Sequence, residues 1–489
     1  MKKILPILLL IVLNFTSVYS QGLWPPSGPS DIDLLSGPVY YYQLYNLSWG
    51  GYLPPEPYTA DRTFPVGPSV LYSAKATEDM DQDVSPSVLS TTLEGLDYTT
   101  TVFTKYVGYM PARNYFSTTT DFITFTQGEL PMPEGYQVSA NAVLSANVFT
   151  IGIAPGRIYC AGIVFNWVPH IPPNGIAVWY SDDGGRSWSA PTIVSRNDSS
   201  EYFLDRPHID VSWAFGTVGY VYVAYTKYNN SDPTQNQLLV SRSTDGGVSF
   251  EDPVVITIGR IANPQILVNP FYGYAIYALW VDFSANEIRM SRSLSYGKTW
   301  GAPQTAAAGN MIAGNSWNES DYLNGDLRAV TAPRARFNWV KNKICVVWHE
   351  REQPGSNTTV VFYTAKSFQG WQAKVRVNDV QTNDQFMPAL DFDSSGNLKV
   401  IFYDRRDDPN NLLYHQYIAH IDSNGNNLKA NERVSTFQSN PEGYRDHFIG
   451  DYQDIWDWTF SSGEKYHSVW VGIGIPADTG DIYLSGIEP

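Results

Sequence analysis

The sequence predicts an all-β fold, a β-propeller of four-stranded blades, with seven blades by repeat count and six as the alternative count. Three observations support this prediction. A unit of four short strands recurs at intervals of about 45 to 70 residues, a period typical of propeller blades. Aromatic residues make up 14% and charged residues only 16% of the chain, which favours β-structure with many turns. No amphipathic helical period competes with the strands.

The chain begins with a segment typical of a secretory signal peptide, residues 1–20. Lys2 and Lys3 precede the apolar run 4–15, and cleavage is expected near Ser20. The run is shorter than the roughly 20 residues that span a bilayer, which favours a cleaved signal peptide. An uncleaved membrane anchor is the alternative. We therefore expect a secreted or extracytoplasmic protein, with cell-surface association as an option and membrane contact only through this segment.

Residues 21–80 are rich in Pro, Gly and Tyr, with stretches such as "WPPSGP" and "YLPPEPY". This composition predicts an extended leader with little periodic structure, which wraps the main body or links it to a surface. The propeller is expected over residues 81–489.

The repeating unit opens on a short strand that often carries proline, such as "DRPHIDV". An apolar strand such as "YVYVAYTKY" and a third strand such as "QLLVSRS" follow it. Blades are expected to start near Ser85, Ser139, Asp205, Ala262, Ala332, Gln385 and Phe448. The first and last units are the least regular. If one of them completes the ring in pieces, the count is six.

The stretch "YSDDGGRSWSAP" lies between the third and fourth strands of its unit, and its pattern Ser-x-Asp-x-Gly-x-Ser/Thr-Trp/Phe recurs twice. We call these the three repeat turns. Their pattern residues are Ser181, Asp183, Gly185 and Trp188; Ser243, Asp245, Gly247 and Phe250; and Ser293, Gly297 and Trp300, with Ser295 in place of the aspartate. Asp183 is expected to accept bonds from turn amides, Gly185 to supply a positive φ, and Trp188 to pack between blades. One carboxylate per turn does not make a metal or catalytic site.

These turns resemble the Asp-box, or bacterial neuraminidase repeat, of the sialidase superfamily. The resemblance covers roughly residues 80 to 487 of this sequence. Its segments "FYDRRDDPNN" and "FIGDYQDI" resemble those of secreted, sialidase-like Asp-box proteins. It implies a propeller whose Asp-boxes lie on the rim, away from the central pocket. It also implies glycan recognition, with hydrolysis of terminal acidic sugars as an exo-glycosidase.

In that superfamily three arginines clamp the substrate carboxylate, a tyrosine activated by a glutamate is the nucleophile, and an aspartate is the acid and base. The family's Arg-Ile-Pro motif is absent from this sequence. The candidates at strand ends are Arg206, Arg336, Arg405, Tyr403, Glu350 and Asp205. The alternative is structural pairing of arginines with neighbouring aspartates, favoured for Arg405 and Arg406 in "YDRRDD".

Several function classes are excluded or disfavoured. The net charge of −16 argues against nucleic acid, which needs a cationic surface. The seven histidines show no metal-ligand spacing, and no phosphate-binding loop or Gly-x-Ser-x-Gly motif occurs, so no metal and no cofactor is expected. Cys160 and Cys345 lie in apolar runs, which favours two buried free thiols over a disulfide.

The expected partner is a carbohydrate or a cell-surface glycoprotein. The leading hypothesis is an exported, sialidase-like propeller that recognises glycans, and the sequence leaves catalysis open. The alternative is a non-catalytic propeller that binds glycan or protein at the cell surface. A structural cell-surface protein is a third reading, favoured by the proline-rich leader.

Overall fold

The structure is a computed structural model. It describes residues 66–67, 69–77, 82–93, 96–106, 111–147, 156–166, 172–315, 319–320, 322–441, 448–458, 465–473 and 480–488. The expected signal peptide and the leader up to residue 65 lie outside the described residues.

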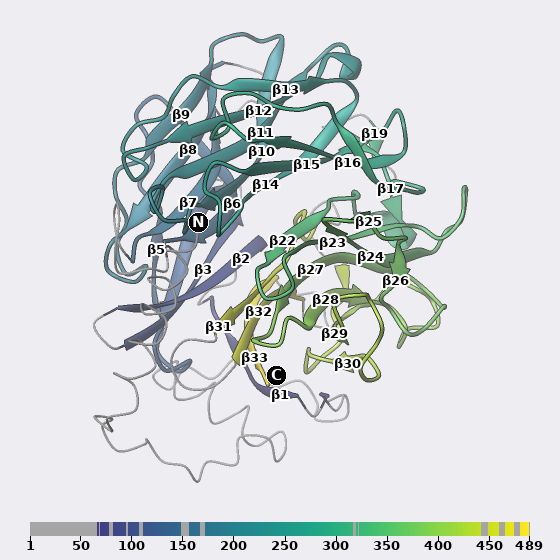
Figure 1. Cartoon of the computed structure of the whole chain (residues 1–489). Coiled ribbons are helices and arrows are strands. Elements are labelled where there is room, and N and C mark those ends of the chain that lie inside the picture. Colours follow the sequence, from purple (N-terminus) through teal and green to yellow (C-terminus); the bar gives the residue numbers. More distant parts are fainter. Residues whose placement is uncertain are drawn as a thin grey trace, which may run out of the picture.

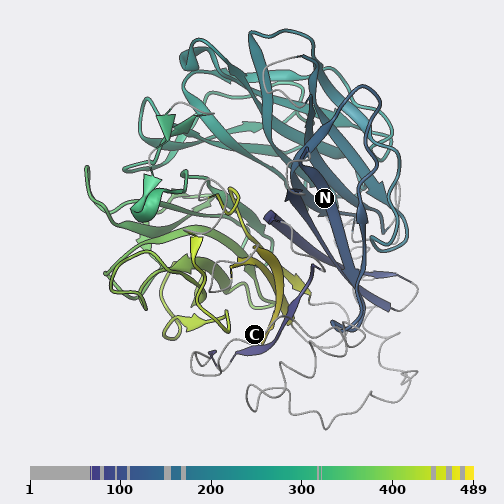
Figure 2. The same cartoon turned by 180° about the vertical axis from the view of Figure 1, so that it is seen from behind.

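The described residues form seven blades arranged around one axis (Figures 1 and 2). Six of these antiparallel sheets have four strands and one has five. The innermost strands contact one another in a closed ring, in the order β2, β6, β10, β14, β22, β27, β31 and back to β2. The prediction of seven blades is confirmed, and the alternative of six is excluded.

The first four blades follow the chain from inside to outside. Blade 1 comprises β2 (Gln82–Leu93), β3 (Leu96–Tyr106), β4 (Arg113–Thr119) and β5 (Thr126–Glu129). Blade 2 comprises β6 (Val138–Ala146), β7 (Ile158–Phe165), β8 (Asn174–Ser181) and β9 (Thr192–Asn197). Blade 3 comprises β10 (Tyr202–Val211), β11 (Val221–Asn229), β12 (Gln237–Ser243) and β13 (Val254–Ile258), with the 3₁₀ turn η2 (Pro233–Gln235) before β12. Blade 4 comprises β14 (Ile261–Val268), β15 (Ile276–Asp282), β16 (Glu287–Ser293) and β17 (Gln304–Ala308).

An insertion separates blades 4 and 5. It holds the short strands β18 (Gly314–Asn315), β19 (Glu319–Ser320), β20 (Tyr322–Leu323) and β21 (Leu327–Arg328), and the 3₁₀ turn η3 (Asn324–Asp326). Blade 5 comprises β22 (Arg334–Asn338), β23 (Lys343–Arg351), β24 (Thr359–Ser367), β25 (Gly370–Trp371) and β26 (Val375–Arg376). Blade 6 comprises β27 (Gln385–Phe392), β28 (Leu398–Asp404), β29 (His415–Ile421) and β30 (Glu432–Arg433).

Blade 7 is built from both ends of the chain. Its inner strands are β31 (Asp454–Trp458), β32 (Lys465–Gly472) and β33 (Asp481–Ile487), and its outer strand is β1 (Val70–Lys75). β1 pairs antiparallel with β33, and the two lie side by side in Figure 1. The propeller therefore starts ahead of the boundary expected at residue 81, because a strand whose only partner is at the far end of the chain carries no local repeat signal.

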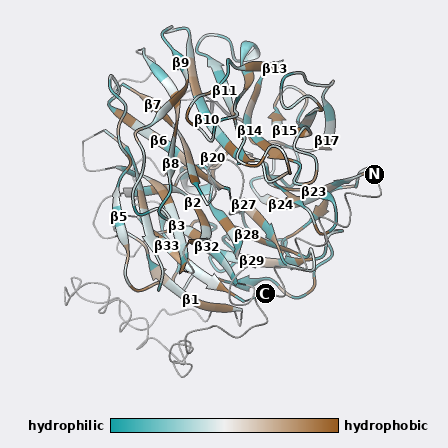
Figure 3. Cartoon of the chain, turned by 60° about the vertical axis from the view of Figure 1, so that its left-hand side comes forward, coloured by the Kyte–Doolittle hydropathy of each residue, from teal (hydrophilic) through white to brown (hydrophobic). Residues whose placement is uncertain are grey.

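The core lies between the blades. Trp280, Trp348 and Trp470 stand on the second strands of blades 4, 5 and 7 and are buried almost completely. Hydrophobic stretches run along the blade strands in Figure 3. Cys160 and Cys345 are both buried and free, as predicted. Within the described residues, no helix has the length and apolar character needed to cross a membrane.

Candidate functional site

Five inner strands share a bulge near their amino ends, where the pairing register shifts. The bulged residues all have positive φ: Ser85 (53°), Asn141 (55°), Arg206 (58°), Asn263 (54°) and Met387 (48°). Four of them precede a proline, which lacks the N–H that a regular ladder would use. The bulge turns side chains toward neighbouring blades, since Asn141 donates to Asp205 (2.8 Å) and Asn263 to the carbonyl of Thr331 (2.8 Å).

Two aspartates lie at the start of blade 7, near the amino ends of the inner strands: Asp451 just before β31 and Asp454 as its first residue. The Asp451 carboxylate contacts Arg206 (Oδ2–Nη1 2.5 Å) and Arg328 (Oδ1–Nη2 2.7 Å). The Asp454 carboxylate contacts Arg334 (3.2 Å) and Arg336 (3.4 Å) through Oδ1. Four arginines are thus shared between two buried carboxylates.

These pairs set the charge states in the channel. Burial alone would raise the pKa of Asp451, but Arg206 and Arg328 lower it below its usual value. Burial raises the pKa of Asp205 despite the opposing effect of Arg206 beside it. Arg206 and Arg336, two of the candidates for the substrate clamp, each contact a carboxylate of the chain itself.

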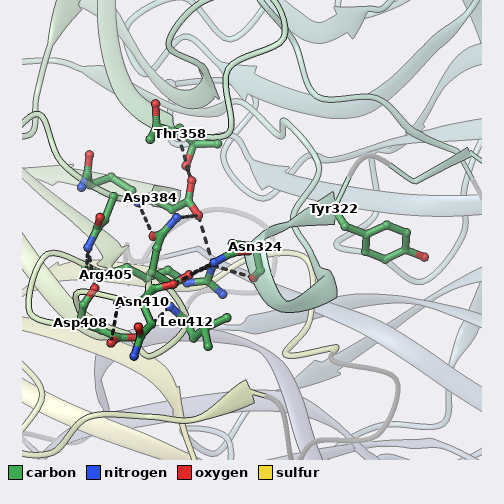
Figure 4. A network of polar contacts seen from close by, with 12 residues as sticks. Tyr322, Asn324, Thr358, Asp384, Arg405, Asp408, Asn410 and Leu412 are labelled. Carbon is green, nitrogen blue, oxygen red and sulfur yellow. Dashed lines mark hydrogen bonds and ion pairs between the residues drawn. The ribbon is translucent and has the colours of Figure 1, made fainter.

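The structure does not bring Arg405 to this channel. Arg405 is fully buried and its Nη1 contacts Asp384 (3.2 Å) and the carbonyls of Asn324 and Asn411 (both 2.9 Å), as Figure 4 shows. The neighbouring Arg406 contacts Asp404 (2.7 Å). Pairing with aspartates, the alternative reading of "YDRRDD", is what these contacts show. A clamp of Arg206, Arg336 and Arg405 is therefore not assembled in the described residues.

Tyr403 and Glu350 also have partners other than the arginines and aspartates described above. Tyr403 is fully buried and its hydroxyl accepts a bond from the Val471 amide (2.9 Å). Burial raises the pKa of Tyr403, the opposite of what a nucleophilic phenolate needs. Glu350 instead accepts from Trp348 Nε1 (2.8 Å) and pairs with Lys374 (2.5 Å).

A cavity of 240 Å³ opens at the other half of the channel, at the carboxyl ends of the inner strands. We call it the central cavity. Its aromatic lining includes Trp213, Trp339, Trp456 and Phe337, and its charged lining comprises Asp210, Asp391, Asp393, Asp457 and Arg336. Trp339 is 42% exposed, so part of the wall faces solvent. Aromatic faces and clustered carboxyl groups make this the strongest candidate for a binding site.

Asp210 and Asp391 hold equivalent places in blades 3 and 6. Asp210 accepts from the amides of Val211 (2.9 Å) and of Val268 in the next blade (2.8 Å). Asp391 accepts from Phe392 (2.9 Å) and from Asp457 in the next blade (2.7 Å). Burial raises the pKa of each carboxyl to about 6, although Arg336 acts to lower both. Perturbed carboxyl groups in a cavity are typical of sites that transfer protons.

Our sequence reasoning missed this set, although a positional signal exists. In blades 3 to 6 the third residue after the proline that opens the inner strand lines the central cavity, and these residues are Asp210, Leu267, Arg336 and Asp391. Side chains alternate along a strand, so a fixed offset from the equivalent proline selects the same face in these four blades. Aligning the units on their prolines would have found both aspartates.

The three repeat turns have equivalent hydrogen bonds. The Gly185, Gly247 and Gly297 amides donate to Ser181, Ser243 and Ser293, at 2.9, 2.8 and 2.9 Å. Asp183 accepts from the Ser187 amide, Asp245 from Ser249, and Ser295 from Thr299, each at 2.9 Å. Gly185 has φ 88°, and Trp188 packs against the cluster between blades 1 and 2, as expected.

The turns lie on the same end of the blades as the central cavity, since they join third to fourth strands as the inner loops join first to second. The Tyr296 amide of the third turn donates to the carbonyl of Tyr274 (3.1 Å), in the loop whose Pro270 lines the cavity. No pattern residue of the three turns is among the described residues that line the cavity.

Among the described residues, no cluster of His, Cys, Asp and Glu has the geometry of a metal site. No family model and no curated protein matches the chain. Solved structures similar to it include a protein of unknown function from Dyadobacter fermentans (11% identity, 86% of this chain and 99% of that one, TM-score 0.48). Others are a GH93 α-L-arabinofuranosidase of Fusarium graminearum (14%, 73% and 95%, TM-score 0.44) and a Hadza microbial sialidase (14%, 66% and 63%, TM-score 0.42). The similarity concerns the propeller architecture alone.

Proposed function

We propose that this protein recognises glycans and that the central cavity binds a neutral sugar. The observation that carries the proposal is the lining of the cavity, where three tryptophans and two phenylalanines stand beside four aspartates. Indole faces stack on the apolar faces of sugar rings, and carboxylates accept bonds from sugar hydroxyls.

The charge of the lining favours a neutral sugar over the acidic sugar implied by the resemblance. Among the described residues that line the cavity, Arg336 is the one lysine or arginine, and it also contacts Asp454 (3.4 Å). A sugar carboxylate entering the cavity would meet four aspartates, and like charges at close range oppose binding.

Calorimetric titration with neutral and acidic mono- and disaccharides tests this proposal. Neutral sugars are expected to bind, and Trp339→Ala is expected to weaken them about tenfold, or about 1.4 kcal/mol, by removing one stacking face. Phe368→Ala is the matched control, because Phe368 is 94% exposed on blade 5 and is absent from the cavity lining. Tighter binding of acidic sugars, or equal behaviour of the two variants, would contradict the proposal.

Hydrolysis is the second candidate function, and the pair Asp210 and Asp391 favours it. Glycoside hydrolysis commonly uses one protonated carboxyl to protonate the leaving oxygen and one carboxylate to activate water or attack the sugar. Two carboxyl groups with pKa values near 6 supply both states at mildly acidic pH.

Product release from neutral oligosaccharides tests hydrolysis. Turnover is expected to fall as pH rises above about 6, and Asp391→Asn is expected to slow it about 100-fold or more. Sugar binding without turnover between about pH 4 and 8 would reject hydrolysis and leave recognition intact.

Export is part of the proposal, because it would bring the protein to extracellular glycans. Sequencing the amino terminus of the protein secreted by its host tests the expected cleavage near Ser20.

A further inference from the structure

A row of exposed aromatic rings leads outward from the central cavity across blade 4. Phe271, Tyr272, Tyr274 and Tyr296 are 47%, 57%, 41% and 41% exposed, and we call them the aromatic strip. The ring centroids of Tyr272 and Tyr274 lie 5.8 Å apart, and those of Tyr274 and Tyr296 lie 6.3 Å apart. At the inner end of the strip, the ring centroid of Phe271 lies 6.5 Å from that of Phe337, which lines the cavity. Tyr272 follows Phe271 in the chain and the preceding Pro270 lines the cavity, so the loop that carries the strip adjoins the cavity wall.

The loop that carries the strip is held in place by its own contacts. The Asn269 side chain accepts from the amides of Phe271 (2.9 Å) and Tyr272 (3.0 Å). Gly273 abuts the neighbouring loop of blade 3 so closely that an added Cβ would lie 1.8 Å from the Thr217 hydroxyl. The rings are thus presented on a preorganised support, which lowers the entropic cost of binding.

Tyr296 gives a second, independent indication that this surface binds a ligand. The first two repeat turns carry Gly184 (φ 77°) and Gly246 (φ 75°) at this position, and the third carries Tyr296 at φ 58°. A tyrosine in the left-handed region is strained, and such strain is concentrated at functional positions. Arg242 from blade 3 supports the turn by donating to the Tyr296 carbonyl (3.1 Å). The chain keeps a ring here at a conformational cost that glycine avoids in the sister turns.

We propose that the aromatic strip binds the continuation of a polymeric neutral glycan whose one end lies in the central cavity. The inference rests on the proposed function, since it takes the cavity to be a sugar site. Large exposed rings in a row are unusual on a soluble surface and mark binding sites. Their tyrosine hydroxyls suit a ligand with apolar ring faces and many hydroxyl groups, and the position of the strip beside the cavity favours a glycan chain over a protein partner.

The test measures affinity for mono- to hexasaccharides cut from linear neutral polysaccharides (β-glucan, xylan, mannan and arabinan). Affinity for the best series is expected to rise with chain length. Tyr296→Gly is expected to reduce the affinity for the longest oligosaccharide about fivefold without changing that for the monosaccharide. This variant restores the residue of the sister turns, and relief of the positive φ offsets the greater unfolded-state entropy of glycine, so it should fold. Tyr296→Phe keeps the ring and should keep most of the affinity, and Phe368→Ala should have no effect.

Three outcomes would overturn the proposal. Equal affinity for short and long oligosaccharides would show that the strip does not bind the glycan. The proposed function of the cavity would then still hold. Full long-chain affinity in Tyr296→Gly would assign the strip to another class of macromolecule, a protein partner above all. Absence of binding by every sugar, the monosaccharides included, would reject the proposed function together with this inference.

Discussion

The two halves of the central channel use the same residue type in opposite ways. At the amino ends of the inner strands, Asp451 and Asp454 each contact two arginines, and arginine contacts lower the pKa of Asp451. At the carboxyl ends, Asp210 and Asp391 are held by backbone amides, and burial raises their pKa to about 6. A carboxyl group's partners therefore distinguish a structural aspartate from one able to exchange protons near neutral pH.

The half of the channel that holds Asp451 and Asp454, which we call the paired half, connects distant parts of the propeller. Asp451 precedes the first strand of blade 7 and bonds arginines from blade 3 and from the insertion before blade 5, so its contacts cross the channel. In the other half acidic side chains outnumber basic ones, because four aspartates and one arginine line the cavity. The first arrangement stabilises the fold, and the second places carboxyl groups with a raised pKa at the cavity wall.

The largest predicted effect comes from breaking the paired half. Asp451→Ala leaves the buried Arg206 without its closest partner, so we expect a loss of about 3 to 5 kcal/mol in unfolding free energy. Urea denaturation checks this value. Asp182→Ala is the matched control, because the Asp182–Arg157 pair lies at the rim with Asp182 55% exposed, and it should cost about 1 kcal/mol or less. Equal losses of unfolding free energy in the two variants would show that ion pairs in the channel and at the rim contribute equally to stability.

The fold could be predicted from the sequence because each blade is a local unit. In blades 1 to 6 the strands that define a blade lie within one repeat, and five of the seven expected blade starts fall inside inner strands. The start expected at Ala332 precedes β22 by two residues, and the one expected at Phe448 precedes β31 by six. The site required pairings that cross the ring. Arg206 lies at the bulge of an inner strand and Arg405 directly follows a second strand, and only the structure shows that Arg206 contacts Asp451 and Arg405 contacts Asp384.

The pH dependence of stability is expected to have opposite signs in the two halves. The Asp391 carboxyl has its usual pKa near 4 in the unfolded chain and about 6 in the fold. Between these values the folded state binds more protons, so stability should fall as pH rises from about 4 to 6 and then level off. Asp451 has the opposite sign, since its lowered pKa contributes stability that is lost only as pH falls below about 4.

Unfolding free energies of the parent and of Asp391→Asn at several pH values between about 4 and 7 measure this term. The variant loses one acceptor for the amides of Phe392 and Asp457, so its absolute stability is lower. The informative quantity is the slope, which should be flatter in the variant. An unchanged slope would show that Asp391 titrates at its ordinary pKa.

The smallest predicted effect links the halves through Arg336, which contacts Asp454 on one side and lines the cavity on the other. Asp454 raises the pKa of Asp391 and Arg336 lowers it. Asp454→Asn removes the neighbouring negative charge and keeps the side-chain shape, so the pKa of Asp391 should fall by up to about one unit. Arg336→Gln removes the positive charge and should move the pKa of both Asp391 and Asp210 upward. Carboxyl-carbon NMR titration of the two variants checks the signs. Shifts in the same direction would mean that conformational change, and not charge passing through Arg336, connects the paired half of the channel to the cavity.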